Sequence, residues 1–186
     1  MTETVVLETE RLRLREFTAA DVDLFVELDG DPEVMRHLSF EATPRDEVEA
    51  KLLPKILQQY REGPLGTWAA LDRATGEFLG WFELTPTPDR PGEAELGYRL
   101  RRATWGRGLA TEGSLALIDK GFGEWGLSRI WAETMSVNAG SRRVMEKAGL
   151  RYLRTFHVHF DDPLPGTEHG EVEYALTREE WLRARG

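Results

Sequence analysis

The chain has 186 residues and a formal net charge of −9 at pH 7, with 40% hydrophobic residues, 31% charged residues and no cysteine. This composition predicts one domain over residues 1–186 with one hydrophobic core, and it excludes disulfides, thiolate metal sites and a cysteine nucleophile. The acidic charge disfavours nucleic-acid binding. The chain shows no signal peptide and no apolar run of membrane-spanning length, so we expect a cytoplasmic protein with no membrane partner.

The first third of the chain reads as one strand and two helical segments. Alternating apolar residues predict a strand over about 11–17. Thr18 and Asp21 have the spacing of a capping box, which predicts a helix from Thr18 to about Gly30. A second helical segment is predicted over 45–62, and Pro54 inside it should produce a kink or two abutting helices. Its apolar residues recur every four positions: Val48, Leu52, Ile56 and Tyr60.

The middle of the chain predicts strands over 67–71, 77–85 and 93–100, the first two joined by the turn 72–76. In the third strand, alternation puts two sets of side chains on opposite faces: Ala94, Leu96, Tyr98 and Leu100 on one, and Glu93, Glu95, Gly97 and Arg99 on the other. A glycine-containing turn over 105–110 follows. After it we expect an amphipathic helix with these residues facing inward: Leu115, Ile118, Phe122 and Trp125.

The last third predicts two further helices and three strands. A strand over 129–134 precedes a helix that Asn138 caps and Gly149 ends. Strands are predicted over 152–160 and 172–176, with a long loop over 161–170 between them. Thr177 should cap a short terminal helix.

The strand, glycine turn and helix of residues 93–125 have the layout of an anion site. Gly106 and Gly108 allow the backbone to approach a ligand closely, and the first N–H groups of the following helix would face a phosphate. No Walker loop is present. The dinucleotide fingerprint also fails, because Thr111 stands where its third glycine belongs.

Trp105-Gly-Arg-Gly-Leu-Ala110 resembles the acyl-CoA loop of the GNAT superfamily of N-acyltransferases, Gln/Arg-x-x-Gly-x-Gly/Ala, with Trp105 departing from Gln or Arg. The extended form Trp-Gly-x-Gly-x-Ala-Thr-Glu, which ends here at Glu112, is common in the branch that resembles ribosomal-protein N-terminal acetyltransferases. The segment from Asn138 through Ser141 and Lys147 to Gly149 resembles a second block of that branch. The opening residues 7–17 and the closing residues 171–181 resemble its ends.

The resemblance implies an α+β fold: a mixed, mainly antiparallel, V-shaped sheet with helices on both faces. It implies direct acetyl transfer from acetyl-CoA to a primary amine in a ternary complex, without a metal. The acceptor would be a protein N-terminus or a small cationic amine, reached along the helical segment 45–62, and a homodimer is compatible with the family. The implied cofactor-binding residues are Tyr98, Leu100, Trp105, Gly106, Arg107, Gly108, Leu109, Ala110, Thr111, Asn138 and Arg142.

Transfer to an amine near neutral pH benefits from a base, because the amine is mostly protonated there. Glu95 is the first candidate, since its position resembles the catalytic glutamate of some GNAT members; Glu93, Glu133 or a water molecule are the alternatives. The resemblance also implies a backbone N–H for the oxyanion near Arg99 or Leu100, at a bulge in that strand. Ser141 would protonate the leaving thiolate, with Asn138 holding the cofactor's amides. Asn138 as a helix cap and Ser141 as a first-turn polar residue are the structural alternatives.

Two other functions remain open at this stage. His157, His159 and Asp161 alternate, so they could share a strand face and hold a metal in a metal-dependent enzyme. A non-catalytic acyl-CoA sensor would carry the same loop. For the acceptor, we expect an acidic entrance that attracts a cation, formed by Asp46, Glu47, Glu49, Asp161, Asp162 and Glu168.

Overall fold

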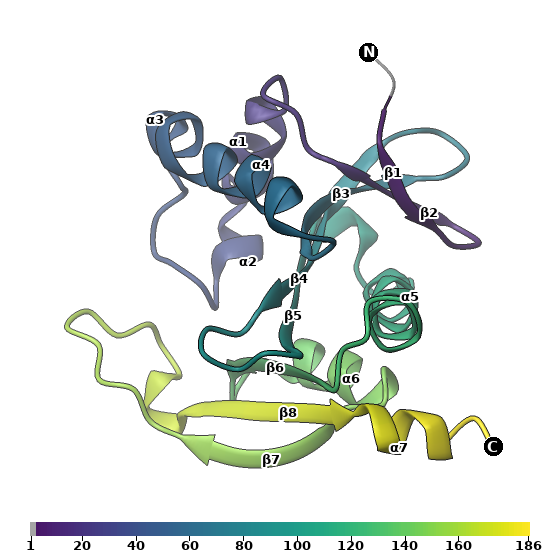
Figure 1. The fold of residues 1–186 in the computed structure, drawn as a ribbon. Helices are drawn as coiled ribbons and strands as arrows, with labels where there is room; N and C mark the ends of the chain where they lie inside the picture. Colours follow the sequence, from purple (N-terminus) through teal and green to yellow (C-terminus); the bar gives the residue numbers. More distant parts are fainter. Residues whose placement is uncertain (1–2) are drawn as a thin grey trace.

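The computed structural model describes residues 3–186, which form an eight-stranded sheet with helices on both faces (Figure 1). The strand order is β1-β2-β3-β4-β5-β6-β8-β7, and β5 and β6 are the one parallel pair among antiparallel neighbours. The predicted α+β class and mainly antiparallel sheet are therefore confirmed. The strands are β1 (Val5–Glu8), β2 (Leu12–Glu16), β3 (Gly66–Asp72), β4 (Phe78–Pro86), β5 (Glu93–Leu100), β6 (Arg129–Met135), β7 (Arg151–Phe156) and β8 (Glu171–Thr177).

Two apolar clusters hold the helices to the two faces of the sheet. One lies between the sheet and α5 and α6, and it includes Phe82, Leu96 and Phe122. The other lies between the sheet and α1 and α4, and it includes Phe25 and Ile56. The helical elements are α1 (Val22–Asp29), α2 (Pro32–Met35), α3 (Arg45–Glu47), the π-helical turn η1 (Val48–Leu52), α4 (Leu53–Glu62), the 3₁₀ turn η2 (Arg102–Thr104), α5 (Leu109–Gly123), α6 (Ala139–Lys147), the 3₁₀ turn η3 (Thr167–His169) and α7 (Arg178–Arg183).

Helix α5 packs closely on the sheet through residues without bulky side chains. A Cβ atom added at Gly113 would lie 2.3 Å from the Phe82 ring, so only glycine fits there. Ile118 and Phe122 are buried as predicted, but the other two residues of the predicted inward face are not on it. Leu115 is 41% exposed, and Trp125 lies beyond the end of the helix, where it stacks on Trp68. The inward face was predicted from the spacing of large apolar side chains, whereas small residues such as Gly113, Ser114 and Gly121 form much of the buried face of α5.

The segment 45–62 confirms the expected interruption. The short helix α3 continues into the π-helical turn η1, and α4 then begins with Pro54 in its first turn. Proline has no backbone N–H, so it is accommodated where the hydrogen-bond pattern already changes. Val48 and Ile56 are buried, as the four-residue spacing predicts.

The strand predicted over 11–17 is confirmed as β2, and a further strand, β1, precedes it in a hairpin in which the Thr9 N–H donates to Leu12 O. Two other predictions need correction. Helix α1 begins at Val22 instead of Thr18, because the Asp21 carboxylate binds Arg15 and the Thr18 N–H in the turn before it. Strand β7 ends at Phe156, where its partner β8 begins.

The remaining strand and cap predictions agree with the structure. Asn138 caps α6, Gly149 follows it with φ of +95°, and Thr177 caps α7 in a capping box with Glu180. Among residues 3–186, no helix is both long enough and apolar enough to cross a membrane.

Candidate active site

The loop between β5 and α5 has the geometry of an anion site. Gly106 and Gly108 have φ of +73° and +78°, in the left-handed region that favours glycine, and no backbone or core atom lies close to either. Gly108 is the N-cap of α5, and no side chain caps the N–H groups of the first turn. These donors and the positive end of the 15-residue helix dipole are therefore available to a phosphate. The Trp105 indole N–H, in contrast, donates to Leu100 O at 2.9 Å.

A clamp that the sequence reading missed fixes this loop to the start of β2. The Glu112 carboxylate accepts hydrogen bonds from Thr9 Oγ1 (2.6 Å), Arg11 N (2.9 Å) and Arg11 Nε (2.7 Å). Arg11 also donates to Arg107 O at 2.8 Å. Burial opposes ionisation of Glu112, but these hydrogen bonds outweigh it and lower its pKa. The glutamate of the Trp-Gly-x-Gly-x-Ala-Thr-Glu motif thus orders the loop instead of facing it.

Strands β5 and β6 separate midway along β5, before the loop begins. They pair only from Glu93–Glu95 to Arg129–Trp131, so beyond Glu95 β5 has no strand partner on that side. The bulge predicted in β5 is absent, since β5 pairs with β4 without a register shift. A register shift occurs instead between β3 and β4, beside Gly80. Gly80 lies against Arg99 and Leu100 of β5. The opening arises because β6 diverges from β5.

Tyr98 lies on the α6 face of β5, at this opening. Its hydroxyl is 2.9 Å from Ser141 Oγ and donates to Ser141 O at 3.2 Å. Burial raises the pKa of Tyr98 to about 12, so its hydroxyl keeps its proton at neutral pH. The sequence reading placed Tyr98 at the cofactor but missed its contact with Ser141, which joins residues 43 positions apart.

Asn138 and Arg142 are engaged within the protein. Asn138 Oδ1 accepts from Ser141 N at 3.1 Å and its amide donates to Thr134 Oγ1, which is the capping alternative weighed above. Arg142 donates to Tyr174 Oη and Ser136 O. Both residues border the Tyr98–Ser141 pair.

Glu95 lies on the opposite face of β5 from Tyr98. Its backbone pairs with β4 and β6, but its carboxyl group makes no hydrogen bond or ion pair with any other residue of the described range 3–186. Burial, together with the neighbouring charges of Glu83 and Glu133, raises the pKa of Glu95 to about 7. A carboxyl group with this pKa is half ionised near neutral pH, which suits a general base.

The two alternative bases differ from Glu95. Glu93 is 2.8 Å from an Arg129 nitrogen and is therefore held in an ion pair. Glu133 lies on β6 opposite Glu173, and burial raises its pKa with a contribution from the Glu173 charge. Glu95 therefore differs from Glu93 in having no cation bound to its carboxyl group within residues 3–186.

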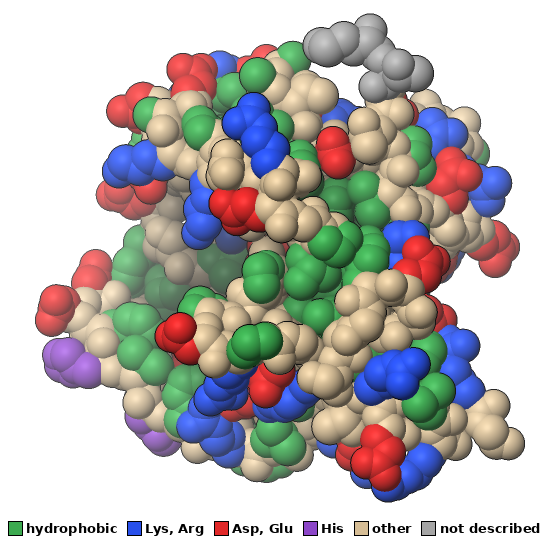
Figure 2. All heavy atoms as spheres, viewed as in Figure 1, with side chains coloured by type: hydrophobic (Ala, Val, Ile, Leu, Met, Phe, Trp, Pro, Cys, Tyr) green, Lys and Arg blue, Asp and Glu red, His purple; other side chains and the backbone are tan. Residues whose placement is uncertain are grey.

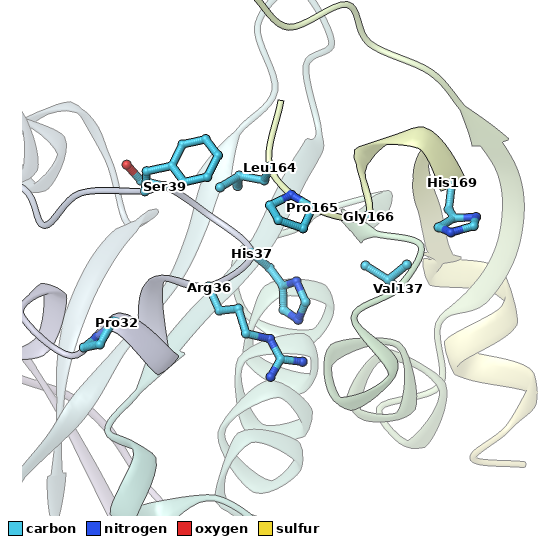
Figure 3. A pocket seen from close by; sticks show the side chains of 10 residues that line it. Pro32, Arg36, His37, Ser39, Val137, Leu164, Pro165, Gly166 and His169 are labelled. Carbon is cyan, nitrogen blue, oxygen red and sulfur yellow. The ribbon is translucent and has the colours of Figure 1, made fainter. Parts of the chain in front are cut away.

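Two cavities lie on the side of the sheet that Glu95 faces. One, of about 340 Å³, lies between the helices α1 and α4 and the strands β4 and β5, and Glu83 and Arg99 line it. The other, of about 560 Å³, lies between the segment after α2 and the loop 164–169. Figure 3 shows Arg36 and His37 approaching it from one side and Val137 and Pro165 from the other. In Figure 2 the surface is hollowed there, with hydrophobic side chains on the walls.

The expected acidic entrance is only partly assembled. Of its six carboxylates, Glu47 alone lines either of these two cavities. Asp161 and Asp162 are exposed in the loop after β7.

The alternative metal constellation is not brought together. Because β7 ends at Phe156, His157 and His159 belong to a loop and do not share a strand face. His159 Nε2 and Asp161 Oδ1 are 3.6 Å apart, and both side chains are almost fully exposed. Within residues 3–186, no group of three or more histidine, aspartate or glutamate side chains has the geometry of a metal site.

Comparison with known proteins gives consistent matches. Residues 11–151 match the acetyltransferase (GNAT) domain family. The chain is 39% identical over 186 aligned positions to the FsC-acetyl coenzyme A-N(2)-transacetylase of Aspergillus fumigatus, covering 95% of this chain and 78% of that protein.

Among solved structures, RimL, a ribosomal L7/L12 alpha-N-protein acetyltransferase in complex with coenzyme A, superposes with a TM-score of 0.80 at 16% identity, covering 95% of this chain and 99% of that one. The spermidine N-acetyltransferase from Vibrio cholerae, in complex with CoA and spermine, superposes with a TM-score of 0.77 at 16% identity, covering 94% and 99%. These two structures share the fold with this chain.

Proposed function

Because this chain belongs to the GNAT family of acetyltransferases, we propose that it transfers an acetyl group from acetyl-CoA directly to a primary amine, with Glu95 as the base. The observation that carries this proposal is the arrangement around β5. An unpaired carboxyl group with a pKa of about 7 lies on one face, and the Tyr98–Ser141 hydroxyl pair lies on the other, where β5 leaves β6.

The cofactor-binding side is formed by α5 and the strand opening. The first-turn N–H groups of α5 would hold the pyrophosphate of acetyl-CoA, with Gly106 and Gly108 leaving room for it. The edge of β5 beyond Glu95 would pair with the pantetheine amides in place of β6. A backbone N–H at this edge, near Arg99 or Leu100, would stabilise the oxyanion.

The chemistry then runs from one face of β5 to the other. Glu95 accepts a proton from the acceptor ammonium, and the neutral amine attacks the thioester carbonyl carbon to form a C–N bond. The tetrahedral intermediate collapses with cleavage of the C–S bond. The hydroxyl pair of Tyr98 and Ser141 donates a proton to the leaving thiolate, and solvent restores it. The second N–H proton of the amine passes to solvent, and Glu95 releases its proton to solvent before the next turnover. Because the amine attacks the thioester directly, no acyl-enzyme forms.

The acceptor enters, in this proposal, from the side of α1 to α4, the sheet face on which Glu95 and Glu83 lie; Glu83 lines the cavity of about 340 Å³ there, and Glu95 lines neither cavity. Of the solved structures that share this fold, one is an alpha-N-protein acetyltransferase and another is a spermidine N-acetyltransferase. A protein N-terminus and a small polyamine are therefore the two acceptor classes that we propose. We expect an amine that is positively charged in solution.

A transfer assay tests the proposal. The protein is incubated with acetyl-CoA and a panel of amines that includes spermidine, alaninamide and short peptides, and released thiol is measured together with the mass of each amine. We expect thiol release that requires an amine and adds one acetyl group to it. Acetyl-CoA binding without acetylation of any amine would contradict the proposal and favour a sensor.

A further inference from the structure

A second carboxyl group, Glu83 of β4, lies on the same sheet face as Glu95. The register pairs Glu83 with Gly97 and Thr85 with Glu95, so Glu83 and Glu95 are diagonal neighbours across two adjacent strands. Such neighbours lie close enough for long side chains to interact.

Gly97 provides the space that Glu83 occupies. A Cβ atom built on Gly97 would lie 2.5 Å from Glu83 Oε1 and 2.9 Å from Glu83 Cγ. Any other residue at position 97 would therefore displace the carboxylate. The backbone of Gly97 is not in the left-handed region, so glycine is required here for space and not for its dihedral angles.

Glu83 has no ion-pair partner among residues 3–186. Its Oε2 accepts one hydrogen bond, from Thr67 Oγ1 at 3.2 Å. Arg99, which lines the same cavity, forms its ion pair with Asp29 at 2.6 Å, and the Asp29 side chain is fully buried. Arg99 and Lys55 therefore act on Glu83 only as nearby charges, and the Glu83 carboxylate has room for a bound cation.

The cavity of about 340 Å³ lies directly against this carboxylate. Its walls combine apolar side chains such as Phe25 and Ile56 with the polar groups of Thr67 and Glu83. A space of this size admits an amine with a short side chain.

From this geometry we propose that Glu83 binds the acceptor as an ammonium ion and holds it between its own carboxylate and that of Glu95. Two carboxylates without an intervening cation repel each other, and an ammonium ion between them relieves that repulsion. One proton then passes from the ammonium nitrogen to Glu95, and Glu83 stays ionised. This inference rests on the proposed function and adds to it the residue that selects a cationic acceptor.

The charges around Glu83 come from four elements. Arg99 and Glu95 face it from β5, Lys55 from α4, Asp29 from α1 and Glu47 from α3. Burial raises the pKa of Glu83, against the hydrogen bond from Thr67 and the charges of Arg99 and Lys55. Glu83 in turn helps to raise the pKa of Glu95.

Two variants and a control test the proposal. Glu83→Gln removes the charge, and Glu83→Asp keeps the charge but shortens the side chain by one methylene. Glu171→Gln is the control, because Glu171 lies on the same face on β8 and does not contribute to the pKa shift of Glu95. Spermidine and alaninamide are titrated calorimetrically into each protein saturated with CoA, which gives amine binding without turnover.

We expect Glu83→Gln to weaken binding of both amines about tenfold or more, since it removes one partner of a partly buried charge pair. Glu83→Asp should weaken it less, and Glu171→Gln should stay within about twofold of wild type. CoA affinity should be unchanged in all three. Wild-type amine affinity in Glu83→Gln would overturn the proposal.

A second measurement does not depend on amine binding. The Glu95 carboxyl carbon is followed by NMR against pH, and its titration midpoint should fall in Glu83→Gln but not in Glu83→Asp or Glu171→Gln. An unmoved midpoint in Glu83→Gln would also overturn the proposal. Failure of the proposed function gives a different result: amines bind to the wild-type protein and bind more weakly to Glu83→Gln, but no thiol is released from acetyl-CoA.

Discussion

At the scale of single residues, the reactivity of the site depends on which polar groups are left without partners. Glu93 and Glu173 are both bound to Arg129, whereas Glu95 has no such cation. Sequence alternation could place Glu93 and Glu95 on one face, but it could not tell them apart. Their difference arises from Arg129, which lies 36 residues beyond Glu93 in the chain and reaches it only through the parallel pairing of β5 and β6.

The hydroxyl pair gives the first prediction at this scale. If the Tyr98 and Ser141 hydroxyls protonate the thiolate together, Tyr98→Phe and Ser141→Ala should each lower kcat by about tenfold to a hundredfold, with acetyl-CoA affinity nearly unchanged. The double variant should be no slower than the slower single variant, because either change breaks the same pair. Stopped-flow measurement of thiol release checks this, and a loss confined to acetyl-CoA affinity would make both residues binding groups only.

At the scale of elements, the acyl-CoA loop is held by contacts that the motif does not reveal. The turn at its two glycines and the helix that follows could be predicted from residue spacing alone, and the structure confirms both. The clamp could not, because Glu112 and Arg11 are 101 positions apart and meet only when β2 and α5 lie side by side. The same limit applies to Glu83 and Gly97, whose complementarity depends on strand register.

Gly108 gives a prediction with a matched control. Gly108 and Gly126 both have positive φ, +78° and +69°, and neither has a backbone or core atom close to the position of an added Cβ. Valine at either position should therefore cost a similar amount of stability, on the order of 1–2 kcal/mol or more. Only Gly108→Val should abolish acetyl-CoA binding in calorimetry, since only Gly108 lies at the N-terminus of α5. Equal affinities in the two variants would remove the loop from the binding site.

At the scale of the whole molecule, the net charge is −9, and several of the carboxyl groups lie on the acceptor side of the sheet. Carboxyl groups of β4, β5 and β6 follow one another across one sheet face: Glu83, Glu95 and Glu133. The sequence predicted an acidic entrance on the helical segment 45–62 and the loop 161–170, because a sequence does not show that three separate strands bring Glu83, Glu95 and Glu133 together. The sheet class, most strand positions and the helix caps were predictable from local patterns. The early end of β7 was not, because it depends on where β8 begins.

An electrostatic approach predicts a salt response. The specificity constant kcat/KM for a cationic amine should fall several-fold between 0.01 and 0.3 M salt, because the Debye length shrinks from about 30 Å to well under 10 Å. If the exposed loop carboxylates contribute, replacing Asp161 and Asp162 together by Asn should reduce this fall. Since neither residue lines either of the two cavities, kcat should be unchanged in the double variant. A flat salt response with wild-type protein would contradict electrostatic attraction of the acceptor.

The pH dependence of acetyl transfer by wild type and Glu95→Gln tests the central claim most directly. The pKa of Glu95 is raised to about 7, so the basic form is present above that pH and is lost as the pH falls through it. The wild-type kcat/KM should therefore fall on the acid side with an apparent pKa near this value. Glu95→Gln should lower the rate by about 10² or more and remove that limb, with acetyl-CoA affinity retained. A Glu95→Gln enzyme that keeps the wild-type rate and the same acid limb would contradict the assignment of Glu95 as the base.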